Sequence, residues 1–87
     1  MSQFMNELNI TLSKDEALVL FEFFARFDDN NQFVLRNNAE YLAFSKISGQ
    51  LQKALTEPFN PNYQVILHAA QSRLADGYEG LAPGVNP

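Results

Sequence analysis

The sequence contains no cysteine and no tryptophan, and it has a single histidine, His68. The lack of cysteine excludes disulfide bonds and thiolate metal sites, and a small domain without disulfides is typical of the cell interior. We therefore expect a cytoplasmic protein. A helical metal site at His68 would need a second ligand three or four residues away, where Gln64, Val65, Gln71 and Ser72 stand. We expect no metal and no cofactor.

Positive charge and long hydrophobic runs are also scarce. Six Lys and Arg stand against ten Asp and Glu, which gives a net charge of −4. This balance disfavours nucleic acid and anionic membranes, and it predicts that a partner guided by charge is basic. The longest hydrophobic region, residues 17–27, is interrupted by Glu22 and Arg26 and is far shorter than the ~20 residues that span a bilayer. The first ten residues have no positive charge and no apolar stretch, so we expect no secretory signal.

Catalytic sequence patterns are missing too. The chain has no G-x-S-x-G, no P-loop and no dinucleotide-binding fingerprint. Residues 28–32, Asp-Asp-Asn-Asn-Gln, begin like a calcium loop. However, Phe33 stands where such a loop needs glycine, and Ala39 where it needs a bidentate glutamate. We expect a protein that is not an enzyme.

What the sequence does contain is a very apolar segment at residues 13–27, SKDEALVLFEFFARF. Ser13 and Glu16 form a capping box, in which each side chain satisfies a backbone N–H at a helix start. The apolar residues that follow recur at helical spacing. This pattern predicts a helix over residues 14–28.

Only a narrow polar stripe interrupts this predicted helix. It consists of Asp15, Glu22 and Arg26, and the last two are spaced for an i,i+4 ion pair. A helix this apolar needs cover on several sides, from the rest of the chain or from another chain. We therefore predict self-association, with a homodimer as the simplest closed form.

A second capping box, Asn37 with Glu40, predicts a helix over residues 38–56. Tyr41, Phe44, Ile47, Leu51 and Leu55 define its apolar face by spacings of three and four. Gly49 lies in the middle of this helix, where glycine costs about 1 kcal/mol relative to alanine. We interpret it as the mark of a close helix crossing.

Asn60 and Pro61 suit the start of a third helix, predicted over residues 61–76. Gly77 is placed to end it in a left-handed conformation. The connection of residues 58–60 is so short that the second and third helices are expected to be antiparallel neighbours.

These elements predict an all-α protein, a three-helix bundle, with residues 1–76 as a single helical domain and residues 77–87 as a flexible C-terminal tail. Short extended segments at residues 8–12 and 33–35 are the alternative to coil, and whether they pair as strands is left open. The predicted core consists of nine apolar residues: Phe21, Phe24, Leu42, Phe44, Ile47, Leu51, Ile66, Leu67 and Ala70.

Three stretches, LSKDEALVLFEFFARF, NNAEYLAFSKISGQLQKAL and TEPFNPNY, resemble a family of small bacterial proteins. That family combines a helix of the type SKDEALVLFEF, an A-E helix start and an E-P-F-x-P-x-Y junction. The resemblance covers residues 8–75 and implies no particular activity or site. Tyr41 and Phe44 depart from the family pattern, which carries more leucine in the second helix.

The composition and the resemblance predict a non-enzymatic protein-interaction module. Its most concrete form is a small acidic immunity or antitoxin-like protein that binds a basic partner, and the alternative is a homo-oligomeric structural or accessory protein. The predicted partner-binding residues form what we call the acidic edge, four carboxylates beside one ring: Asp15, Glu22, Asp28, Asp29 and Phe23.

Overall fold

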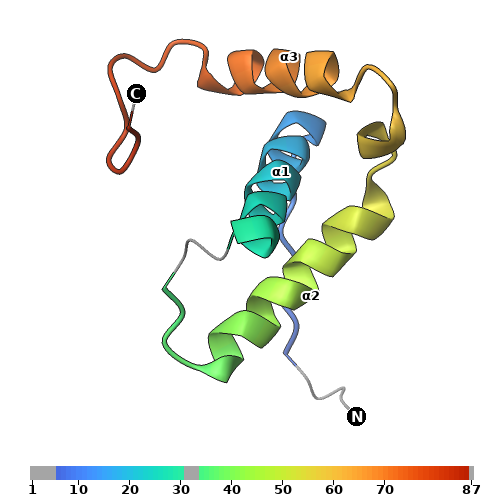
Figure 1. The fold of residues 1–87 in the computed structure, drawn as a ribbon, viewed down its shortest axis with the longest axis vertical. Helices are drawn as coiled ribbons and strands as arrows, with labels where there is room; N and C mark the ends of the chain where they lie inside the picture. Colours follow the sequence, from blue (N-terminus) through green and yellow to red (C-terminus); the bar gives the residue numbers. More distant parts are fainter. Residues whose placement is uncertain (1–5, 31–33, 87) are drawn as a thin grey trace.

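The computed structural model describes residues 6–30 and 34–86. It contains the helices α1 (Lys14–Asn30), α2 (Asn38–Ala54) and α3 (Tyr63–Ala75), and a short 3-10 helix, η1 (Glu57–Phe59), between α2 and α3 (Figure 1). The part of the chain that the structure describes has no strand. The predicted all-α, three-helix fold is therefore confirmed.

The two extended segments suggested by the sequence are not strands where they can be seen. Residues 8–12 and residues 34–35 have no regular secondary structure. Phe33, the first residue of the second segment, lies outside the described residues. Leu8 and Ile10 are 92% and 80% exposed, so residues 8–12 pair with nothing in the described chain.

Both predicted capping boxes start helices as expected. The Ser13 hydroxyl accepts from the Glu16 N–H at 3.1 Å, and the Ser13 N–H donates to the Glu16 carboxylate at 2.8 Å. At α2, the Asn37 side chain accepts from the Glu40 N–H at 3.0 Å. The Glu40 carboxylate accepts from the N–H of Arg36 at 2.7 Å, one residue before the cap. Local hydrogen bonding thus fixes the first turns of α1 and α2.

The third helix begins later than predicted, at Tyr63 instead of residue 61. The Asn60 side chain accepts from the N–H of Asn62 at 2.7 Å, so it forms a local turn and does not cap a helix. The end of α3 agrees with expectation, since Gly77 follows the helix with a φ of 85°.

The helices α2 and α3 both pack on α1, which runs between them (Figure 1). The prediction that α2 and α3 are antiparallel neighbours is wrong. The physical reason is that α2 ends early, at Ala54, and η1 then carries the chain around the end of α1 before α3 begins. The connection is therefore longer than the three residues that the prolines suggested.

The core lies where the three helices meet. Leu18 of α1 is 1% exposed and clusters with Leu51 of α2, with Leu55 directly after α2 and with Ala70 of α3. Of the predicted core, Leu51, Leu67 and Ala70 are buried, and Phe21, Phe24, Phe44 and Ile66 are half-buried. Three buried hydrophobic residues of the described part were missing from the prediction: Leu18, Phe27 and Leu55.

Two predicted core residues of α2 are wrong. Leu42 is 65% exposed and Ile47 is 48% exposed. The helix is rotated so that Phe44, Ser48 and Leu51, at spacings of four and three, face inward. Ser48, a polar residue, therefore occupies the inward position next to Ile47 and is 8% exposed.

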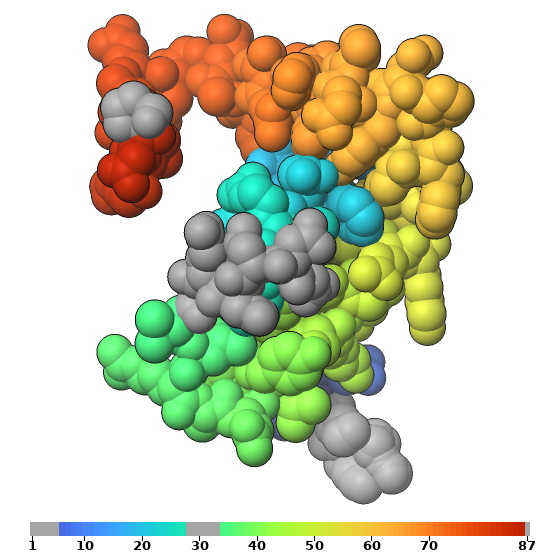
Figure 2. Space-filling model, viewed as in Figure 1, coloured from blue at the N-terminus to red at the C-terminus, as the bar shows by residue number. Residues whose placement is uncertain are grey.

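The molecule is elongated, with extents of 42 × 28 × 26 Å and a radius of gyration of 15.1 Å. A compact chain of this length would have a radius of gyration of about 12 Å. The space-filling view shows residues at the C-terminal end standing apart from the helices (Figure 2). None of the described helices has the length and hydropathy needed to cross a membrane.

Candidate interaction surface

The acidic edge begins at Asp15, which is already engaged with α3. The Arg73 guanidinium donates two hydrogen bonds of 2.8 Å to the two carboxylate oxygens of Asp15. This bidentate contact holds the pKa of Asp15 below its usual value of 3.8 and raises the pKa of Arg73. Asp15 therefore joins the first turn of α1 to the last turn of α3.

Glu22 is also directed to α3. Its carboxylate accepts a hydrogen bond of 3.0 Å from the Tyr63 hydroxyl. Burial, together with this carboxylate, raises the pKa of Tyr63 to about 12. The predicted ion pair of Glu22 with Arg26 is not among the ion pairs of the described residues. The Arg26 guanidinium lies instead 5.7 Å from the ring centroid of Phe23.

The remaining members of the acidic edge are only partly described. Phe23 is half-buried, and its ring centroid lies 5.7 Å from that of Phe24. Asp28 and Asp29 belong to the last turn of α1, and their side chains lie outside the described part. The structure thus turns Asp15 and Glu22 toward α3, and the acidic edge as a partner-binding surface stays a prediction.

A polar contact that the sequence analysis missed joins Lys14 to Glu57, with 2.8 Å between the ammonium nitrogen and one carboxylate oxygen. The other carboxylate oxygen of Glu57 is buried without a hydrogen-bond partner. The ammonium of Lys14 holds the pKa of Glu57 below its usual value of 4.5. Neighbouring residues at the start of α1, Lys14 and Asp15, therefore bind η1 and α3. Their partners are 43 and 58 residues away, and no local sequence signal marks such distant pairs.

Exposed apolar side chains lie elsewhere than the sequence suggested. Every large apolar side chain of α1 in the described part is buried or half-buried, so the cover that this helix needs comes from the chain itself. The other helices cover it. The large exposed hydrophobic residues are instead spread over the other elements: Leu8, Ile10, Leu12, Val34, Tyr41, Leu42, Ile47, Phe59, Val65, Leu74, Tyr78, Leu81 and Val85.

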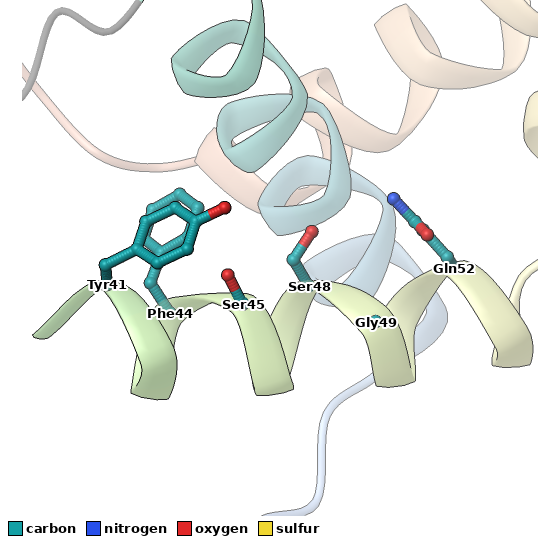
Figure 3. A pocket seen from close by; sticks show the side chains of 6 residues that line it. All are labelled: Tyr41, Phe44, Ser45, Ser48, Gly49 and Gln52. Atoms are coloured by element: carbon teal, nitrogen blue, oxygen red, sulfur yellow. The ribbon is translucent and has the colours of Figure 1, made fainter. Parts of the chain in front are cut away.

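A depression of about 170 Å³ lies along the side of α2 that borders α1. Figure 3 shows its side chains rising from the same side of α2. The Phe44 ring is fixed at one end, because its centroid lies 4.5 Å from that of Phe24 and 4.7 Å from that of Phe27. The depression is lined by two aromatic rings and four small or polar residues: Tyr41, Phe44, Ser45, Ser48, Gly49 and Gln52.

Gly49 does not mark a close helix crossing, contrary to the interpretation of the sequence. A Cβ atom added at Gly49 would have no heavy atom within 4 Å. The physical reason is the rotation of α2, which turns Gly49 away from the α1 contact. Within the described chain, the helix therefore carries a glycine that no neighbouring element requires.

Half-buried Gly49 also belongs to a row that we call the α2 stripe, formed with the exposed residues Leu42, Lys46 and Lys53. The spacings of four, three and four residues place these residues on one helical face. Lys46 and Lys53 are exposed, and neither takes part in the two ion pairs of the described residues. The α2 stripe is therefore a basic surface with an apolar end at Leu42 and an open backbone at Gly49.

The chemistry of the depression is that of a binding surface. Its lining offers two serine hydroxyls, a tyrosine hydroxyl and an amide, but no carboxylate, histidine or lysine. No group of three potential metal ligands occurs in the described ranges. The arrangement can offer hydrogen bonds and aromatic contacts to a bound group of the size of one aromatic ring.

Comparisons of the chain with protein-family models, with curated proteins and with solved structures give no match. The resemblance to small bacterial proteins remains a prediction.

Proposed function

We propose that this chain is a non-enzymatic protein-interaction module that acts in the bacterial cytoplasm. One observation carries the proposal. In the described part, thirteen large hydrophobic side chains are at least 39% exposed, whereas only six hydrophobic residues are buried. Extensive exposed apolar surface is typical of proteins completed by another protein chain.

The first form of this proposal is a small acidic immunity or antitoxin-like protein with a basic partner. The net charge of −4 supports it. Asp15 and Glu22 are engaged with α3, so electrostatic steering in this form would depend mainly on Asp28 and Asp29. Charge reversal at these two positions would then slow association with the basic partner.

The second form is a homo-oligomeric accessory protein, and the distribution of charge supports it. The α2 stripe is basic at Lys46 and Lys53, whereas the chain beyond α3 carries Asp76 and Glu79 and no basic residue. Surfaces of opposite sign on one chain favour contact between copies over repulsion.

Two measurements test the proposal. The first is the mass of the purified protein by sedimentation velocity from low to high micromolar concentration. The second is affinity capture from bacterial lysate at low and moderate salt, with the Asp28→Lys/Asp29→Lys variant as the comparison. A protein that is monomeric throughout and captures nothing would refute the interaction module. A captured basic protein that the double variant loses would favour the first form, and a concentration-dependent mass would favour the second.

A further inference from the structure

The part of the chain that follows α3 presents apolar side chains with no cover. Here we call residues 76–86 the C-terminal segment. Tyr78 is 62% exposed, Leu81 is 60% exposed and Val85 is 51% exposed. Two backbone hydrogen bonds turn the segment: the N–H of Tyr78 donates to the Ala75 carbonyl and the N–H of Val85 donates to the Ala82 carbonyl, each at 3.0 Å.

This segment lies far from α2 of its own chain. It leaves the end of α3 that points away from η1, with α1 between it and α2 (Figure 1). In the space-filling view the red end of the chain is separated from the body by open space (Figure 2). Its exposed side chains are therefore placed for contact with another molecule.

The α2 stripe and this segment are opposite in charge. The stripe carries Lys46 and Lys53, which are both exposed. The segment carries Asp76 and Glu79, which are also exposed, and no basic residue. If Asp76 meets Lys53 and Glu79 meets Lys46, the pairing brings Tyr78 next to Gly49.

The depression has room for the ring that this pairing brings to Gly49, which belongs to its lining. Cavities of roughly 150 Å³ accept one benzene ring, and the depression measures about 170 Å³. Its serine hydroxyls and the Gln52 amide can pair with a phenol hydroxyl.

We propose that the C-terminal segment of one copy docks on the α2 stripe of a second copy, with the Tyr78 ring in the depression beside Gly49. The docking is reciprocal, so that each copy gives one segment and receives one about a two-fold axis. This inference rests on the homo-oligomeric form of the proposed function. It also gives Gly49 a purpose, since a residue without a side chain lets the incoming ring lie close to the helix backbone.

The experiment measures the dissociation constant of the full-length dimer by sedimentation at several concentrations. Tyr78→Ser removes the aromatic anchor and is expected to weaken the dimer about 30-fold or more. Glu79→Lys is expected to weaken it about tenfold, and adding Lys46→Glu to Glu79→Lys is expected to restore most of the loss. Glu7→Lys, which reverses an exposed acidic residue at the other end of the chain, is the matched control. Circular dichroism verifies that each variant keeps the wild-type helix content.

The outcomes separate this inference from the proposal on which it rests. A dimer weakened by Tyr78→Ser and rescued by the charge exchange supports the inference. A dimer whose dissociation constant is unchanged by these variants but that is lost with Ile10→Asn overturns the inference. The contact would then lie at residues 8–12, and the homo-oligomeric function would stand. A wild-type protein that stays monomeric at high micromolar concentration overturns both the inference and the homo-oligomeric form, and leaves the form with a basic partner. If Lys46→Glu does not restore the dimer of a folded Glu79→Lys variant, the paired charges on which the docking depends are wrong and the inference is overturned.

Discussion

The contact of α1 with α3 differs in kind from the contact of α1 with α2. Toward α3 and η1, α1 uses apolar packing and three polar side-chain contacts, made by Lys14, Asp15 and Glu22. Toward α2, the contacts that the structure describes are apolar: the leucine cluster around Leu18 and the rings around Phe44.

This difference explains why the position of α3 on α1 is specified more closely than the rotation of α2. Hydrogen bonds are directional, so Arg73 and Tyr63 set both the height and the rotation of α3 on α1. Ring and leucine packing tolerates several rotations of a helix. The rotation that α2 adopts buries Ser48 and exposes Leu42 and Ile47, and it leaves Lys46 and Lys53 of the α2 stripe in contact with solvent.

The strongest test of this comparison is Leu18→Ala, because Leu18 touches both α2 and α3. Loss of a fully buried leucine at the meeting point is expected to lower the free energy of unfolding by about 3 kcal/mol. Leu42→Ala is the matched control, and its effect should stay within about 0.5 kcal/mol because Leu42 is 65% exposed. Urea denaturation at low micromolar concentration measures both variants. Equal losses would show that the rotation of α2 described here is wrong.

The next test concerns the α2 side alone. Phe44→Leu removes the contacts with the rings of Phe24 and Phe27, and we expect a loss of about 1–2 kcal/mol in the free energy of unfolding. Phe59→Leu makes the same change in η1 at a ring that is 84% exposed, and it should be nearly neutral. If Phe44→Leu were as mild as this control, the ring cluster would not be what holds α2 on α1.

The sequence was sufficient to predict the features that depend on local contacts. The starts of α1 and α2 follow from the capping boxes at Ser13 and Asn37, whose partners lie three residues away. The left-handed residue after α3 follows from Gly77. Such short-range pairings leave few alternatives, so the helices and their order could be predicted.

The rotation of α2 and the long-range polar contacts could not be predicted, for two physical reasons. The apolar residues of α2 allow two rotations, one that turns Ile47 inward and one that turns Ser48 inward, and packing on α1 selects the second. The carboxylates of the acidic edge are visible in the sequence, but the donors that reach them, Arg73 and Tyr63, are 58 and 41 residues away. The depression on α2 depends on the same rotation, and a serine and glycine pair in a helix gives no signal of it.

Gly49→Ala is expected to change the free energy of unfolding in the opposite direction, because it should stabilise α2. Alanine favours a helix by about 1 kcal/mol over glycine, and its methyl group would meet no neighbour within 4 Å. We therefore expect the monomer to gain about 1 kcal/mol in the free energy of unfolding. Gly77→Ala is the control, because Gly77 has a φ of 85° and the same change there should destabilise the protein. A loss at Gly49 in the monomer would mean that a close contact exists at this position.

The smallest expected effect is a loss of folding stability at acid pH. It should come from the contacts of α1 with α3 and η1 and not from its contact with α2. The pKa values of Asp15 and Glu57 are lowered in the folded protein from 3.8 and 4.5. A lowered carboxyl pKa stabilises the folded state at pH values above the ordinary pKa, and this stabilisation is lost as the pH falls through the lowered pKa.

The wild type should therefore lose stability below pH 4.5 more steeply than the Asp15→Asn/Glu57→Gln variant. Glu7→Gln, at an exposed carboxylate outside this contact, should keep the wild-type slope. Because both ion pairs are exposed to solvent, added salt should reduce the difference between wild type and double variant. Melting temperatures from pH 6 to pH 3 at two salt concentrations measure it, and parallel curves for wild type and double variant would show that these pairs do not hold α3 and η1 on α1.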